Sequence, residues 1–215
     1  AAASKPRPWS RVSFYASSSN TSVEGSETRR FSELTTAFSY QLPDVDEGGV
    51  DYGIDARYSA FSQGGRPART SLYEGFVGMR LMGGRLRARA GHLWLTDVGA
   101  LGSVAGGAAE FRQARATQDE GRIRVGAFAG LEPNILDLGY AEQVTKYGAY
   151  VAYDGAAAQR HSLGYVSIRH GALTERAVVT TTNFLPVRRR FFLYQAAEYN
   201  VTAPAGIGRS GLAYF

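Results

Sequence analysis

The sequence predicts an all-β protein, an antiparallel up-and-down barrel of about twelve strands. Three observations indicate this fold: apolar residues alternate with polar or small ones, the alternating segments are long, and runs rich in Gly, Ser, Asn and Asp separate them. The composition agrees, because 26 Gly, 13 Tyr and 11 Phe accompany a mean hydropathy of only −0.22. We expect one barrel domain, residues 1–215, whose first residues, 1–9, form a flexible segment.

The alternation has a period of two, as in a strand with one apolar face. Between residues 122 and 131, Ile123, Val125 and Ala127 share one face, and Arg122 and Arg124 share the other. Helical spacing fits such segments less well. The expected strands are 10–18, 30–42, 50–62, 69–82, 85–95, 105–115, 121–131, 145–154, 160–170, 172–184, 188–200 and 207–215.

The length of these segments favours a membrane. Most have about nine to fourteen residues, whereas strands of globular proteins usually have about five or six. A tilted membrane crossing needs about 9–11 residues per strand. Residues Gly83-Gly84 predict a two-residue hairpin turn. The connections also tend to alternate between longer and shorter ones, as outer-membrane barrels do on their two sides.

The segment 121–130, GRIRVGAFAG, resembles the Gly- and Arg-interleaved strands of bacterial outer-membrane β-barrels, porin-like barrels in particular. Through its strand pattern the resemblance covers nearly the whole chain. It implies a bacterial outer-membrane location, contact with membrane lipid, and passive passage of small solutes or ions, anions among them. The class commonly ends in an aromatic residue, as Phe215 does, but Ala213, Gly211 and Arg209 depart from its apolar ending. Phe215 is therefore expected to be either the true end of the barrel or a point inside a larger one.

Charged residues on the polar face predict the lining of a lumen, because an arginine at the lipid midplane costs roughly 2–4 kcal/mol. We interpret them either as a ladder of paired charges that braces the interior or as a positive wall that favours anions. Glu33 is a further expected partner of the arginines. The predicted lining residues are Arg57, Arg85, Arg87, Arg89, Arg122, Arg124, Asp51, Asp55, Glu74 and Glu110.

The connection 94–104, WLTDVGALGSV, is long, apolar and glycine-rich. In porin-like barrels such a loop can fold inward and narrow the channel, and the resemblance implies this arrangement. The alternative interpretation is an exterior loop whose apolar residues pack on the rim.

No motif predicts catalysis, a cofactor or a metal site. His92, His161 and His170 lie on separate segments, and the chain has no HxH, HExxH or G-x-S-x-G motif and no cysteine. The net charge is +5, but the arginines alternate along strands and form no single basic stripe, so we expect no nucleic-acid partner.

A soluble β-sandwich or barrel that acts as a binding module, for carbohydrate or another ligand, is the alternative function. A lipid-facing band must be apolar on every strand, whereas a sandwich needs apolar residues only on two inner faces. The mixed faces of 160–170 and 188–200 keep the soluble alternative open.

Overall fold

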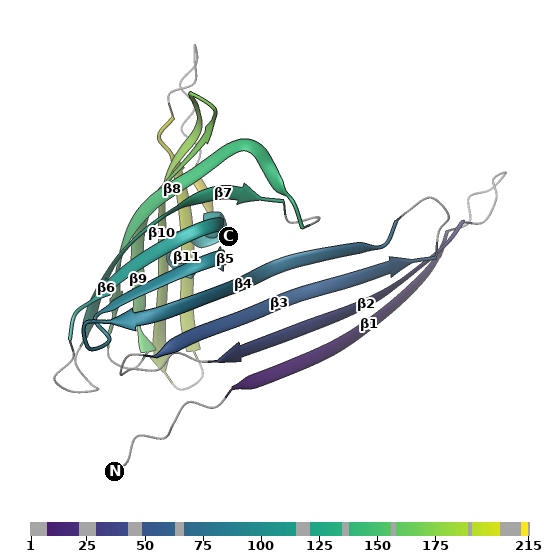
Figure 1. Cartoon of the computed structure of the whole chain (residues 1–215), viewed down its shortest axis with the longest axis horizontal. Coiled ribbons are helices and arrows are strands. Elements are labelled where there is room, and N and C mark those ends of the chain that lie inside the picture. Colours follow the sequence, from purple (N-terminus) through teal and green to yellow (C-terminus); the bar gives the residue numbers. More distant parts are fainter. Residues whose placement is uncertain are drawn as a thin grey trace.

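Twelve antiparallel strands form one continuous sheet in the computed structural model, which confirms the predicted all-β class and strand number. The structure describes residues 8–21, 29–42, 49–62, 67–114, 121–134, 138–155, 158–188, 191–202 and 212–214. Each strand pairs with its neighbours in sequence (Figure 1). The strands are β1 (Trp9–Thr21), β2 (Arg29–Leu42), β3 (Val50–Phe61), β4 (Arg69–Leu81), β5 (Leu86–Trp94), β6 (Ser103–Arg112), β7 (Arg122–Pro133), β8 (Tyr140–Asp154), β9 (Arg160–His170), β10 (Leu173–Arg188), β11 (Phe191–Asn200) and β12 (Leu212–Tyr214).

Among the described residues the sheet is open, with β1 and β12 at its two edges. Strands β1–β4 run side by side as a broad, gently bent surface, and the later strands curl round to form a concave face (Figure 1). A short 3-10 segment, η1 (Thr96–Leu101), connects β5 to β6 and contacts β8, β9 and β10. Within the described ranges, no helix has both the length and the apolar character that a membrane crossing requires.

The observed strands differ from the predicted ones mainly at their ends. β8 begins at Tyr140, five residues before the predicted start, and β10 continues to Arg188. These extensions break the alternation, with Glu142-Gln143 in β8 and Leu185-Pro186-Val187 in β10. Backbone pairing does not depend on that alternation, so the ladder runs past the alternating pattern. Of the predicted strand 207–215, only Leu212–Tyr214 lies within the described residues, and it pairs with β11.

The turn between β4 and β5 is longer than predicted. Leu81 and Leu86 form the last pair, so four residues rather than two make the connection. Met82, Gly83 and Gly84 all have positive φ, at 55°, 64° and 82°. The predicted alternation of long and short connections is also weaker than expected. The link between Arg112 and Arg122 has nine residues, one more than the eight between β5 and β6, because β6 ends at Arg112, three residues before the predicted strand end.

The two faces of the sheet differ sharply in polarity. On β7, Ile123 and Val125 are 48% and 51% exposed, whereas Arg124 is 5% exposed. The same inversion recurs along the sheet, so the period-two pattern is confirmed. The exposed apolar face, called the outer face below, includes Val12, Phe14, Leu34, Phe38, Tyr52, Ile54, Val77, Met79, Phe111, Ile123, Val125, Tyr147, Val151, Leu163, Tyr165 and Tyr199. Buried polar residues of the opposite, inner face include Thr35, Ser39, Asp51, Ser59, Arg80, Glu110, Arg112, Arg124, Lys146, Ser162 and Thr180.

The segment 160–170, whose faces are mixed in the sequence, follows this inversion in its middle. Leu163 and Tyr165 are exposed, and Ser162 and Gly164 are buried. The pairing of β9 with β10 is irregular between Thr174 and Arg176, which places the mixed pattern near a bulge. On β11 the mixed character remains, since Phe191–Tyr194 are all exposed.

Three glycines lie opposite one another across β5, β6 and β7. Gly91 pairs with Gly106, and Gly106 pairs with Gly130. A Cβ atom on Gly106 would lie 2.1 Å from the carbonyl oxygen of Ala129, and one on Gly130 would lie 2.2 Å from that of Ala105. This row therefore permits a close backbone approach that no other residue allows.

Substituting Gly106 by Ala is expected to destabilise the sheet by about 1–3 kcal/mol, because the new methyl group overlaps the neighbouring backbone. Gly107→Ala is the matched control, since the nearest atom to its Cβ is 3.8 Å away. Urea unfolding of both variants measures the difference. Equal midpoints for the two would contradict the close approach.

Candidate functional site

The connection between β5 and β6 folds inward over the inner face of the sheet. Its Val98 is fully buried and belongs to a small apolar core with Leu93, Val104 and Phe128. Gly164 on β9 leaves room for it, because a Cβ there would lie 2.7 Å from a Val98 methyl carbon. The connection thus folds inward, as the resemblance implies. The alternative prediction, an exterior loop whose apolar residues pack on the rim, is wrong.

The two ends of this connection, at Leu95 and Gly102, approach each other closely. The amide of Leu95 donates to the carbonyl of Gly102 at 2.9 Å. A Cβ atom on Gly102 would lie 2.1 Å from the Leu95 carbonyl oxygen, so glycine is required at this crossing. Gly99 has a φ of 64° and turns the segment inside η1. The loop is therefore a compact unit that projects Thr96 and Asp97 toward the strands.

Arg124 on β7 is the centre of a charged network around this loop. Its guanidinium donates to Asp97 of η1 at 2.9 Å, to Glu110 of β6 at 2.6 Å and to Asp154 of β8 at 2.8 Å. The Arg124 side chain is only 6% exposed. One buried arginine thereby joins the loop to three strands of the sheet, β6, β7 and β8.

Each of the three carboxylates also binds a second arginine. Asp97 accepts from Arg160 at 2.8 Å, Glu110 accepts from Arg112 at 2.5 Å, and Asp154 accepts from Arg122 at 3.3 Å. The Tyr150 hydroxyl donates to Glu110 at 2.7 Å. Since buried charges are tolerated only when paired and hydrogen-bonded, this shared pairing explains how so many charges occupy the inner face.

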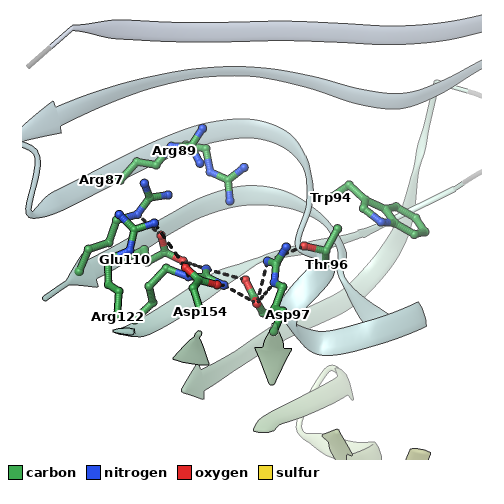
Figure 2. Close-up of a pocket in the computed structure, with 11 residues that line it drawn as sticks. Arg87, Arg89, Trp94, Thr96, Asp97, Glu110, Arg122 and Asp154 are labelled. Atoms are coloured by element: carbon green, nitrogen blue, oxygen red, sulfur yellow. Dashed lines mark hydrogen bonds and ion pairs between the residues drawn. The ribbon is translucent and has the colours of Figure 1, made fainter. Parts of the chain in front are cut away.

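These groups surround a cavity of about 350 Å³ beside η1. Figure 2 shows Glu110, Asp154 and Asp97 gathered on one side, and Arg87 and Arg89 across from them. Arg87 binds Asp51 of β3, and Arg89 lies 5.6 Å from the centre of the Phe76 ring. The lining residues are Arg87, Arg89, Trp94, Thr96, Asp97, Glu110, Arg112, Arg122, Arg124, Asp154 and Arg160.

The structure brings together five of the ten predicted lining residues in this cavity: Arg87, Arg89, Arg122, Arg124 and Glu110. A sixth, Asp51, lies just outside it as the partner of Arg87.

Three more predicted residues, Arg57, Asp55 and Glu74, line a second hollow of about 390 Å³ over β1–β4, which shares Trp94 with the first cavity. Arg57 lies 5.2 Å from the centre of the Tyr73 ring. Asp55 accepts a hydrogen bond from Ser39, and Glu74 accepts one from Gln41.

Arg85, the tenth, lines neither space. It lies in the turn between β4 and β5 and is exposed, because the strand begins one residue later than predicted. Glu33, the further expected partner, accepts from Thr35 at 3.0 Å.

Four charged residues of the cavity were not predicted: Asp97, Arg112, Asp154 and Arg160. Asp154 faces Arg122 in the β7–β8 register, so pairing the two predicted strands as a hairpin would find it. Arg112 shares the polar face of its strand with Glu110. Asp97 has no such signal, since its position depends on the fold of the loop.

A second polar contact supports the base of the loop. Lys146, 1% exposed, donates to the carbonyl of Ser103 at 2.9 Å and pairs with Glu132 at 2.6 Å. His92 lies 3.3 Å from the Ser103 hydroxyl. Lys146 therefore anchors the start of β6, directly after η1, to β8.

The three histidines lie apart. His161 stacks on Tyr153 and contacts Asn183 at 2.9 Å, and His170 ends β9. Among the described residues, no group of three or more His, Asp and Glu is arranged to hold a metal ion. The cavity offers fixed charges and hydrogen-bond donors.

Comparison of the chain with protein families, curated proteins and solved structures finds no match.

Proposed function

We propose that this chain forms the wall of a bacterial outer-membrane β-barrel and acts as a passive, porin-like channel. In this channel η1 folds into the lumen and narrows it. The observation that carries the proposal is the inverted distribution of polarity, with large apolar side chains exposed on the outer face and paired charges buried on the inner one. Its partners are then membrane lipid on one side and small solutes or ions on the other. No catalytic step is involved.

A soluble protein has little reason for this inversion. Monomeric soluble proteins rarely expose contiguous apolar patches larger than about 300–600 Å². Here exposed apolar side chains recur from β1 to β11. Lipid covers such a surface around a whole circumference, as outer-membrane barrels require.

The length of the strands also supports a membrane crossing. All strands from β1 to β11 have between 9 and 16 residues. About 9–11 tilted residues cross the hydrocarbon region, and the longer strands leave residues to extend beyond it.

The soluble binding module needs a second layer that covers the outer face. The described residues form one sheet and supply no such layer. The open edges of β1 and β12 set a condition on our proposal, because lipid does not tolerate unpaired backbone groups. In the membrane the sheet closes, either by pairing its two edges or through further strands of the same barrel.

Reconstitution into planar bilayers tests the proposal. We expect discrete conductance steps that persist across voltages and that scale with the amount of chain added. The matched control is the same preparation kept in denaturant and diluted without refolding. Membranes that take up the refolded chain without any conductance would limit the function to a structural barrel.

A further inference from the structure

Another cavity, called the β10–β11 cavity below, lies between η1 and the strands β10 and β11, and its volume is about 330 Å³. Its floor is the inner face of these two strands. Thr182 pairs there with Ala196, and Thr180 pairs with Glu198. Residues directly opposite each other on one face of an antiparallel pair have Cβ atoms about 4.5–5.5 Å apart. The register therefore places these four side chains next to one another.

The lining of the β10–β11 cavity differs in charge from that of the cavity around Arg124. Among the described residues, no arginine or lysine lines it, whereas six arginines line the other. Small residues keep the space open, with Gly99 and Ala100 on η1 and Ala196 on β11. A Cβ atom on Gly99 would lie 3.8 Å from the Thr182 methyl carbon, so η1 comes within van der Waals reach of the floor.

Two aromatic side chains border the cavity. Trp94 and Tyr194 both line it, and they are 39% and 55% exposed. Figure 2 shows the Trp94 ring turned away from Arg87, Glu110 and Asp154. The face of an aromatic ring is partially negative and attracts partially positive C–H groups. The two rings thus offer stacking surfaces to the flat face of a cyclic ligand.

Two polar groups of the floor have unused hydrogen-bonding capacity. The Oε2 atom of Glu198 accepts from Arg176 at 3.0 Å, and its Oε1 atom has no partner among the described residues. The buried hydroxyl of Thr180 also has no partner within the described ranges. Because buried polar groups are normally hydrogen-bonded, an unpaired carboxylate oxygen opposite an unpaired hydroxyl indicates a ligand that carries hydroxyl groups.

We propose that the β10–β11 cavity binds a neutral cyclic polyol of the monosaccharide type, with its ring against Trp94 and its hydroxyl groups on Glu198 and Thr180. Arg176 already compensates the Glu198 charge, so the lining offers no net charge to an ionic solute. A volume of about 330 Å³ holds roughly ten water molecules at about 30 Å³ each, which suits a ligand of about that many non-hydrogen atoms.

The inference rests on the proposed function for its role, which is to hold a solute that passes η1. The floor of the cavity belongs to the inner face, away from the apolar outer face. The ligand is therefore a free solute and not the headgroup of a membrane lipid.

Glucose is the probe and Trp94 is the reporter. The chain has only 2 Trp, so the Trp9→Phe variant leaves Trp94 as the single fluorophore of its kind. In an amine-oxide detergent, which has no sugar headgroup, we expect glucose to change the Trp94 fluorescence saturably at millimolar concentration. Sorbitol, an acyclic polyol of similar size, should bind at least about fivefold more weakly, because it has no ring face to stack.

Two variants that fill the cavity locate the site. Ala196→Leu should weaken glucose binding about tenfold, because the added side chain occupies the floor. Ala100→Leu fills the same space from an exposed position on η1, so it should give a similar loss with little effect on folding. Ala37→Leu is the matched control, since this half-buried alanine lines the hollow over β1–β4 instead. Far-UV circular dichroism verifies that each variant is folded.

No saturable response to glucose, an equal response to sorbitol, or unchanged binding in either folded cavity variant would overturn the inference. A response to octyl glucoside below its critical micelle concentration, with none to free glucose, would indicate a lipid-like ligand and would overturn it as well. Binding in detergent does not depend on conduction. Saturable glucose binding without conductance therefore counts against the channel alone, and conductance without glucose binding counts against this site alone.

Discussion

The Asp97→Asn variant is expected to conduct several-fold more than the wild-type chain. Asp97 is the acceptor through which both Arg124 and Arg160 hold η1 against the wall. An amide offers one oxygen and no charge, so the loop loses its ionic attachment and leaves the Arg124 charge less compensated. We expect the free energy of unfolding to fall by about 2–3 kcal/mol, because breaking a buried pair strands its partner.

Single-channel conductance and urea unfolding measure the two effects. Glu33→Gln makes the same chemical change at a carboxylate whose one donor among the described residues is Thr35, so it should cost under about 1 kcal/mol and leave conductance unchanged. A normal conductance together with normal stability in Asp97→Asn would show that the apolar contacts of Val98 and the hydrogen bond from Arg160 to Thr96 suffice to hold the loop.

The Phe38→Arg variant is expected to fail in membrane assembly. Phe38 lies on the outer face of β2, opposite Ala56 in the middle of β3, and is 41% exposed. In lipid, an arginine near the midplane costs roughly 2–4 kcal/mol, whereas on a water-exposed surface the same change is usually within about 0.5 kcal/mol. The variant therefore tests whether lipid or water covers the outer face.

Gln41→Arg on the same strand is its matched control. Gln41 lies on the inner face and donates to Glu74 at 3.4 Å, so an arginine there gains a carboxylate partner. We expect Gln41→Arg to fold into detergent micelles and vesicles like the wild type, and Phe38→Arg to give a strongly reduced yield of folded chain. Equal yields for the two variants would count against a lipid-facing outer face.

The strands could be predicted because alternation follows directly from the pleat of a strand. Arg124 and Val125 are assigned to opposite faces by the sequence, and the structure agrees. The ends of strands were less predictable, as β8 shows, because backbone pairing continues where the side-chain pattern stops. Arg85 fell outside the cavity for the same kind of reason, since a one-residue error at a turn removes a side chain from its face.

The centre of the site was only half predictable. The charges on β5, β6 and β7 follow from alternation, but Asp97 reaches Arg124 only because Val98 packs against strands that come much later in the chain, where Gly164 leaves space for it. Such a long-range packing contact has no local sequence pattern. The glycine row across β5–β7 is similar: the glycines are visible in the sequence, but their alignment depends on three registers at once.

The most direct test of a lipid-facing outer face is to refold the chain with and without detergent and to compare far-UV circular dichroism with heat-modifiable mobility on gels. We predict a β-rich, heat-shifting species that forms only in detergent or lipid, because the outer face needs an apolar solvent. A monodisperse, β-rich monomer in plain buffer would contradict the membrane barrel and direct attention to the soluble binding module.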